Sequence, residues 1–229
     1  MSDRPPERPR KGPLTSEFWE IPDEVDDPQW AGRRRASEAA RRIAHNLVIT
    51  YADPARLDRV AALLEEAADL LAEAPTWTVA EAFAEGRLGQ SPQQYADRQS
   101  IIGRANPFAP PLRLSRQGDR VVGHVTFDHA HGGAPGWVHG GIVAAVFDQA
   151  MGYVLITEGV PCVTASIEVR YEKPTRLHVP LTVTAWEVGE RAHHTLVEAE
   201  LRDGEQVVAR ATGDFVRLDP ARFRRIALG

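Results

Sequence analysis

The segment Gly136–Gly152, which reads GWVHGGIVAAVFDQAMG, combines residue types that could act together on a carbonyl group. His139 precedes Gly140 and Gly141 at the expected start of a helix, and Asp148 follows within that helix. Glycines at a helix start let a ligand approach the backbone, and the free N–H groups of the first turn can bind a developing oxyanion. His139 would then flank the oxyanion site. The alternatives are a capping role for His139 and tight helix packing for the glycines.

Asp148 is the residue of this segment that most needs a role. From Gly140 to Thr157 the sequence is apolar at nearly every position, which predicts a buried rather than an amphipathic helix. An isolated buried carboxylate costs roughly several kcal/mol unless it is paired or used. Perturbed buried acids cluster at active sites, so we predict a catalytic Asp148. The alternative is a structural carboxylate that accepts hydrogen bonds from a neighbouring strand or subunit.

The spacing of Gly140 and Asp148 limits how they can cooperate. Eight residues of one helix separate the two positions by about 12 Å along the axis, so one carbonyl could hardly touch both. If both serve the same carbonyl, Asp148 must come from a second copy of the helix packed antiparallel. We therefore predict a homodimer with composite sites at its symmetric interface.

Other reactive residues form no recognised catalytic or metal-binding pattern. His129 and His131 lie near His139, yet no downstream cysteine or acidic cluster completes a metal set, so we predict no metal site. The single cysteine, Cys162, cannot form an internal disulfide and has no evident base beside it. No Gly-x-Ser-x-Gly motif supports a serine hydrolase.

Composition places the chain among ordinary globular proteins. Its 229 residues are 43% hydrophobic and 26% charged, with a formal net charge of -5. This charge argues against a nucleic-acid binder, which usually carries a basic stripe. No apolar run has the length of a membrane span, and the polar, proline-rich start lacks a signal-peptide core. We expect a cytoplasmic protein.

The N-terminal part is predicted to be separate from the catalytic domain. Residues 1–30 mix proline and charge with few apolar anchors, which favours a disordered arm or one laid over a surface. Residues 31–105 should form a helical extension and connector, with two helices broken near Asp53 and Pro54. We interpret its basic runs as a solvated helix face, with a phosphate or nucleic-acid patch as the alternative; they are Arg33, Arg34, Arg35, Arg41 and Arg42.

Residues 106–229 have the texture of an α+β domain. A hairpin over 112–115 and 121–127 precedes the apolar helix. Four further alternating segments follow, at 163–171, 181–188, 195–201 and 207–218, and Asp203-Gly204 supplies a hairpin turn. This order predicts a curved antiparallel sheet wrapped around one central helix.

The stretch from about Asn106 to Leu218 resembles the hotdog-fold thioesterases of the phenylacetate-degradation type, in the branch related to human thioesterase superfamily member 4. The resemblance rests on four features that together are quite specific: Asn106-Pro-Phe-Ala-Pro-Pro, Pro135-Gly-Trp-Val-His-Gly-Gly, Asp148, and Thr164-Ala-Ser-Ile-Glu-Val-Arg-Tyr-Glu-Lys-Pro.

The resemblance implies hydrolysis of acyl-coenzyme A thioesters. Asp148 would act as general base or nucleophile, and the Gly140 N–H would bind the oxyanion. Thr164 would help to place the water or Asp148, and His139 would orient the carbonyl. Such proteins are dimers or tetramers with sites composed across the dimer, and no cofactor is implied beyond coenzyme A as part of the substrate.

Coenzyme A carries phosphates, so basic residues are expected at the mouth of the site. The candidates for contacting coenzyme A are Gly141, Arg170, Tyr171, Lys173, Arg191 and His193.

Two features leave alternatives open. Many relatives carry an asparagine six residues before the motif histidine, where this chain has Gly133, so Thr164 or another group must hold the water. Thr164 could also belong to an ordinary polar strand face that alternates with Ser166, Glu168 and Arg170. The rival functions are a non-hydrolytic acyl-coenzyme A binding module, a hotdog dehydratase, and an interaction protein that uses the arginine-rich helices.

Overall fold

The computed structural model of the chain describes residues 20–76, 81 and 92–219. Two long helices, α1 (Pro28–Ile49) and α2 (Pro54–Ala72), form its N-terminal part. Each starts with proline after an aspartate that accepts hydrogen bonds from the first turn, which confirms the predicted break at Asp53 and Pro54. α1 begins inside the predicted arm of residues 1–30, most of which lies outside the described residues.

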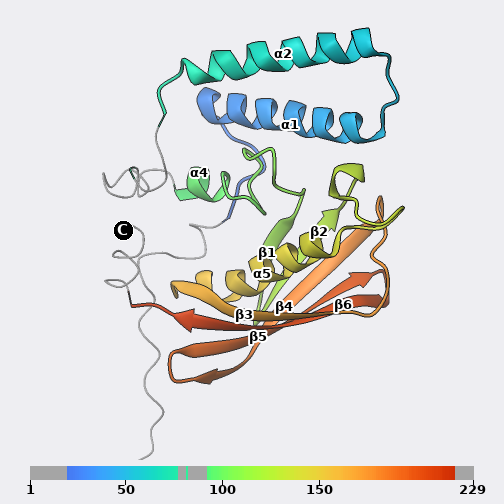
Figure 1. Cartoon of the computed structure of the whole chain (residues 1–229). Coiled ribbons are helices and arrows are strands. Elements are labelled where there is room, and N and C mark those ends of the chain that lie inside the picture. The colour runs from blue at the N-terminus through green and yellow to red at the C-terminus, as the bar shows by residue number, and fades with distance from the viewer. Residues whose placement is uncertain (1–19, 77–80, 82–91, 220–229) are drawn as a thin grey trace, which may run out of the picture.

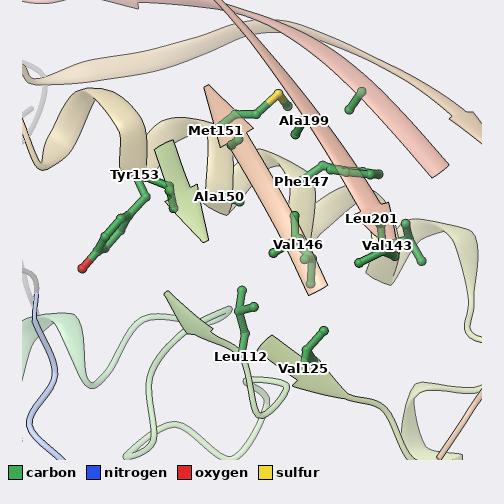
Figure 2. Packing of buried hydrophobic residues seen from close by; sticks show 14 of the residues in the cluster. Leu112, Val125, Val143, Val146, Phe147, Ala150, Met151, Tyr153, Ala199 and Leu201 are labelled. Atoms are coloured by element: carbon green, nitrogen blue, oxygen red, sulfur yellow. The ribbon is translucent and has the colours of Figure 1, made fainter. Parts of the chain in front are cut away.

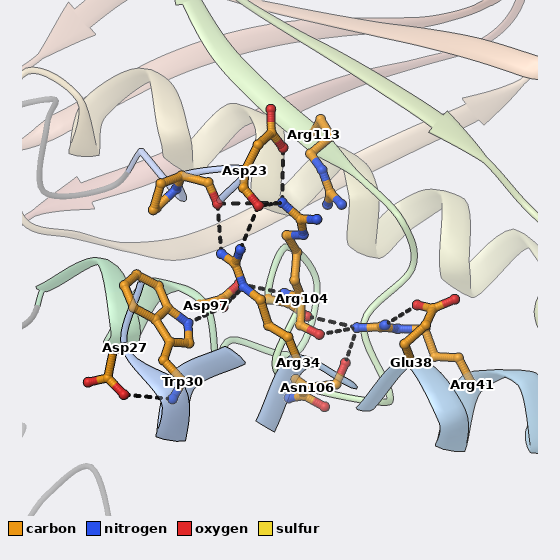
Figure 3. A network of polar contacts seen from close by, with 12 residues as sticks. Asp23, Asp27, Trp30, Arg34, Glu38, Arg41, Asp97, Arg104, Asn106 and Arg113 are labelled. Atoms are coloured by element: carbon orange, nitrogen blue, oxygen red, sulfur yellow. Dashed lines mark hydrogen bonds and ion pairs between the residues drawn. The ribbon is translucent and has the colours of Figure 1, made fainter. Parts of the chain in front are cut away.

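The connector after α2 includes the short helix α4 (Pro92–Ala96) and is tied to α1 by arginines. Arg34 donates to the carboxylate of the fully buried Asp97 at 2.7 Å, and Arg41 donates to the backbone oxygens of Arg104 and Asn106 at 2.6 and 3.0 Å. The predicted solvated face is therefore wrong for Arg34 and Arg41, because both side chains dock α1 onto the connector (Figure 3).

A six-stranded antiparallel sheet forms the rest of the molecule, in the order β1-β2-β4-β5-β6-β3. The predicted hairpin and the Asp203-Gly204 turn are both present, with Gly118 and Gly204 in the left-handed conformation that their tight turns require. The strands are β1 (Arg113–Gln117), β2 (Arg120–Thr126), β3 (Cys162–Tyr171), β4 (Pro180–Arg191), β5 (His194–Asp203) and β6 (Gln206–Arg217).

The helix α5 (Gly140–Ile156) lies against the curved sheet and carries the core (Figure 1). Nine of its residues are buried, and they pack against residues of the sheet such as Ala199 and Leu201 (Figure 2). A short turn of 3₁₀ helix, η3 (His129–His131), stands between β2 and α5. The sheet wrapped around one helix, with a helical extension, confirms the predicted hotdog fold.

Two surfaces next to α5 stay uncovered in the single chain. β3 pairs only with β6, so its other edge is open, and Val163 on it is 41% exposed. Along α5, one stripe is half-buried or exposed, at positions three or four residues apart: Gly141, Ala144, Ala145 and Asp148. Among the helices described, none has the length and apolar character needed to cross a membrane.

Candidate active site

The start of α5 presents one N–H group to solvent. His139 is the N-cap, and its Nδ1 accepts the N–H of Gly141 at 3.0 Å. This bond satisfies one predicted oxyanion donor, so the ring acts as the cap that we had considered as an alternative. No acceptor among the described residues takes the N–H of Gly140. The structure thus leaves Gly140, rather than Gly141, as the free donor.

Tyr171 holds the same turn from the end of β3. Its hydroxyl donates to the carbonyl oxygen of Gly140 at 2.7 Å. A Cβ at position 140 would lie 3.3 Å from the Tyr171 ring, so glycine is needed for this close approach. Tyr171 therefore positions the oxyanion turn directly, a role that the sequence did not suggest.

Asp148 and Thr164 are brought together as predicted. The Thr164 hydroxyl donates to Oδ1 of Asp148 at 2.7 Å, across the space between α5 and β3. Asp148 is half-buried in the single chain, so the expectation of a fully buried carboxylate is wrong. The reason is that Asp148 lies on the uncovered stripe of an otherwise buried helix.

A β-bulge in β3 turns Thr164 toward α5. The register skips Ala165: Thr164 pairs with Phe215, and Ser166 pairs with Asp214. Directly paired residues point to the same face of a sheet, so Thr164 shares the inner face with the buried Phe215. Ser166 lies on the outer face with Asp214. The alternative of one continuous polar face from Thr164 to Arg170 is therefore wrong.

Cys162 lies near the Asp148 carboxylate but is not a reactive thiol. Burial, and then the negative charge of Asp148, raise the pKa of Cys162 to about 12. The thiol is therefore neutral at neutral pH and a poor nucleophile, as its position in the sequence had suggested.

The predicted coenzyme A contacts fall in three separate places. Arg170 lies on the outer face beside Glu168, 3.9 Å away, whereas its neighbour Tyr171 points inward. Lys173 follows β3 at the end near the start of α5. Gly141 lies in the first turn of α5, and Arg191 and His193 belong to the β4–β5 hairpin, which lies beside the first residues of β3.

One chain therefore does not assemble these residues into one site. The ten residues of β3 separate the two ends of the sheet by about 30 Å. Arg191 and His193 lie too far from Tyr171 and Lys173 for a shared contact within a chain. The cause is the antiparallel topology, which places consecutive hairpins at opposite ends of the sheet.

Gly133, the position at which many relatives carry asparagine, has no room for a side chain. A Cβ at position 133 would lie 2.8 Å from Cα of His139. The backbone N–H of Gly133 donates to the carbonyl oxygen of Trp137 at 2.9 Å. The loop before α5 has closed onto the motif histidine, so this chain has lost the space for an asparagine.

The histidines near the site are engaged with one another and with Asp128. His131 Nδ1 lies 2.9 Å from Oδ1 of Asp128, and the rings of His129 and His178 are 4.4 Å apart. Within the described ranges, no group of three or more histidine, cysteine or acidic side chains is arranged to hold a metal ion.

Comparison with known proteins assigns the segment that contains α5 and β3. Residues 135–210 match the family model described as the thioesterase superfamily. This segment is thus similar in sequence to the thioesterase superfamily. A relative from Mus musculus, named acyl-coenzyme A thioesterase THEM4, is 32% identical over 90 residues. That match covers 38% of this chain, and the chain spans 39% of the length of the mouse relative.

A solved structure extends the similarity beyond the thioesterase domain. The crystal structure of a thioesterase superfamily protein matches with a TM-score of 0.70 and 28% identity, over 89% of this chain and 98% of that chain. Residues 106–229 make up little more than half of the chain, so the match must include much of the helical extension. The similarity to that structure therefore includes the N-terminal helices.

Sequence reasoning missed two parts of the candidate site. The bulge at Ala165 leaves no sign in the sequence, because alanine neither favours nor forbids it. Tyr171 was predicted to touch coenzyme A, whereas its hydroxyl is bonded to Gly140. The tyrosine and Gly140 are 31 residues apart, so only the fold reveals their contact.

Proposed function

We propose that the protein hydrolyses acyl-coenzyme A thioesters to free acid and coenzyme A. The observation that carries the proposal is the Asp148 carboxylate held at 2.7 Å by Thr164 on the uncovered stripe of α5. The free N–H of Gly140 at the start of the same helix supports it. The activity named for the mouse relative is of the same kind.

The proposed chemistry starts with the thioester carbonyl oxygen on the Gly140 N–H. Asp148 removes a proton from water, and the hydroxide forms a bond to the carbonyl carbon. The resulting oxyanion is stabilised by the Gly140 N–H and the positive end of the α5 dipole. Collapse breaks the C–S bond, and the coenzyme A thiolate takes up the proton. In the alternative route Asp148 attacks the carbon itself, the C–S bond breaks and the coenzyme A thiolate leaves, and water then hydrolyses the anhydride and supplies the proton to the thiolate.

Thr164 supports either route by fixing the carboxylate. Its hydroxyl occupies Oδ1 of Asp148, so Oδ2 is left for the water or for direct attack. His139, with Nδ1 accepting from Gly141, carries its remaining ring hydrogen on Nε2 and can donate it to the thioester.

We further propose that each site combines Gly140 of one chain with Asp148 of another. The two residues are about 12 Å apart along α5 in a single chain, so one carbonyl cannot contact both. Two uncovered surfaces favour a symmetric dimer: the open edge of β3, and the α5 stripe whose small residues allow a second helix to approach. Antiparallel packing of two α5 helices would bring each Gly140 toward the partner's Asp148.

A panel of acyl-coenzyme A esters with free-thiol detection tests the activity. We expect thiol release from at least one ester, and a fall of at least about 100-fold in kcat for Asp148→Asn, which keeps the shape of the side chain but not its basicity. If the protein binds several esters in calorimetry and releases thiol from none, it is an acyl-coenzyme A binding module instead. If Asp148→Asn keeps full activity, the assigned base is wrong.

A further inference from the structure

A large cleft separates the N-terminal helix α1 from the thioesterase domain. Its volume is about 1190 Å³, enough for a ligand of cofactor size. α1 forms one wall, and the loop before β1, the turn η3 and the first turn of α5 form the other. Ile142, only two residues after Gly140, lies in this second wall. The cleft therefore opens beside the proposed oxyanion donor.

The wall formed by α1 is fixed by buried polar contacts. Asp97, fully buried, accepts hydrogen bonds from Trp30 Nε1 at 2.5 Å and from Arg34 Nε at 2.7 Å (Figure 3). The backbone N–H of Arg104 donates to its other oxygen at 2.8 Å. These contacts fix the position of α1 relative to the rest of the protein. The cleft is therefore preformed.

The cleft has an excess of positive charge. Its two acidic lining residues, Glu38 and Asp128, are engaged by Arg41 and His131. Two further lining arginines are paired with Asp97 and Asp23. Among the residues that the structure describes, no carboxylate lies within ion-pair distance of the other three arginines of the lining, which are Arg35, Arg42 and Arg113.

The three unpaired arginines face one space from two sides. Arg35 and Arg42 are two helical turns apart on α1, about 10 Å along its axis, and both line the cleft. Arg113 lies across from them at the start of β1. Burial and the charge of Arg104 lower the pKa of Arg113, which shows a cation held where solvent neutralises it poorly.

The rest of the cleft is apolar. Alanines line it along α1, and the opposite wall presents Pro107, Phe108 and Ile142. Phe108 is 68% exposed, an unfavourable arrangement for a large aromatic side chain. A ligand with an apolar body and an anionic end would cover Phe108 and neutralise the arginines.

We propose that this cleft binds an anionic end of the thioester substrate, with Arg35 and Arg42 as the contacting residues. The inference rests on the proposed function, because it places one arm of a thioester whose carbonyl lies at Gly140. Two parts of such a substrate carry this chemistry: the phosphates of coenzyme A, and a terminal carboxylate on the acyl chain. The helical extension would then select substrates, with the catalytic groups in the domain below.

The test compares two double variants of the full-length protein. Arg35→Gln with Arg42→Gln removes the cleft charges, whereas Arg33→Gln with Arg59→Gln removes the same charge from exposed positions outside the lining. Each protein is assayed with hexanoyl and adipoyl esters, on coenzyme A and on N-acetylcysteamine, which lacks phosphates. Calorimetry with free coenzyme A and with adipate reports binding without catalysis.

If the cleft binds phosphates, the cleft variant should have a KM about tenfold higher for both coenzyme A esters, and its affinity for free coenzyme A should fall by the same factor. The kcat for these esters, and the kinetics with the N-acetylcysteamine esters, should not change. If it binds the acyl carboxylate, only the adipoyl esters and adipate should change. The control variant should match wild type. Equal KM and equal binding in all three proteins would overturn the inference. A protein that hydrolyses nothing, yet loses coenzyme A or adipate binding only in the cleft variant, would contradict the proposed hydrolysis and keep the cleft.

Discussion

Thr164 and Tyr171 both reach α5 from the inner face of β3, although they are seven residues apart on one strand. In a regular strand an odd separation places two side chains on opposite faces. The bulge at Ala165 adds one residue and restores a common face. This single irregularity lets one strand hold both the Asp148 carboxylate and the Gly140 turn.

The composite site predicts that two inactive chains can complement each other. Gly140→Pro removes the N–H of the first helical residue, a position where proline is tolerated, and the extended His139 before it suits a proline; its ring also adds a Cβ toward Tyr171. Mixed with Asp148→Asn chains, it should form heterodimers with one intact site. Random pairing should restore about a quarter of wild-type kcat after unfolding and refolding together.

The controls for complementation are direct. Gly140→Ala keeps the N–H and brings the same Cβ toward Tyr171, so it separates loss of the donor from crowding. Gly140→Pro alone and Asp148→Asn alone should each stay inactive after the same unfolding and refolding. Absence of any recovery, in a mixture shown by native mass spectrometry to contain heterodimers, would place the whole site within one chain.

Removing the Thr164 hydroxyl should slow catalysis without loss of substrate binding. Thr164→Val keeps the shape of the side chain but leaves Oδ1 of Asp148 without its 2.7 Å donor. We expect kcat to fall roughly tenfold with KM unchanged, because the carboxylate is no longer held in one orientation. Thr164→Ser should stay near wild type. An unchanged kcat in Thr164→Val would contradict this role.

The contact between Tyr171 and Gly140 should appear as coupling in a double-mutant cycle. Tyr171→Phe removes the hydrogen bond and should cost about 1 kcal/mol of stability. Gly140→Ala should lower kcat in wild type but do less harm in Tyr171→Ala, since the ring 3.3 Å away is then gone. Purely additive effects on kcat would mean that the tyrosine does not position the turn.

Alkaline pH should destabilise the fold through two buried acidic groups. The pKa of Cys162 is raised to about 12 by burial and Asp148, and the pKa of Tyr153 is raised to about 12 by burial and Glu20. Between their ordinary values and pH 12 the folded chain keeps protons that the unfolded chain loses, so stability falls as pH rises.

The loss should reach up to about 1.4 kcal/mol per pH unit for each group. Urea unfolding at pH 7.5, 9, 10 and 11 measures it. Cys162→Ala should flatten the slope that begins near pH 9, and leave the part due to Tyr153. The same slope in wild type and Cys162→Ala would show that the thiol is not the titrating group.

The buried Asp97 should be the polar residue most important for holding α1. Asp97→Ala leaves the Arg34 side chain, 10% exposed, without its ion-pair partner and should cost about 3–5 kcal/mol in chemical unfolding. Glu190→Ala breaks the pair with the more exposed Arg217 and should cost no more than about 1 kcal/mol. Equal losses in the two variants would mean that α1 docks by other contacts.

The element order and the helix that carries the catalytic candidates could be predicted because both depend on local patterns. The alternating segments predicted all six strands of the described sheet within a few residues, and the apolar run predicted α5 from Gly140. Asp53 and Pro54 predicted the break between α1 and α2 through capping chemistry that needs no distant contact. The docking arginines were misjudged because their partners, such as Asp97, lie more than 60 residues away.

The sequence by itself therefore determined which residues could do chemistry: an acid and a glycine-rich start on one apolar helix. Only the tertiary structure decided how they are used. It set the face of Thr164 through the Ala165 bulge, assigned the Gly141 N–H to His139, and left the N–H of Gly140 free. Periodicity is a property of neighbouring residues, whereas register, bulges and docking depend on side chains that meet only after the chain has folded.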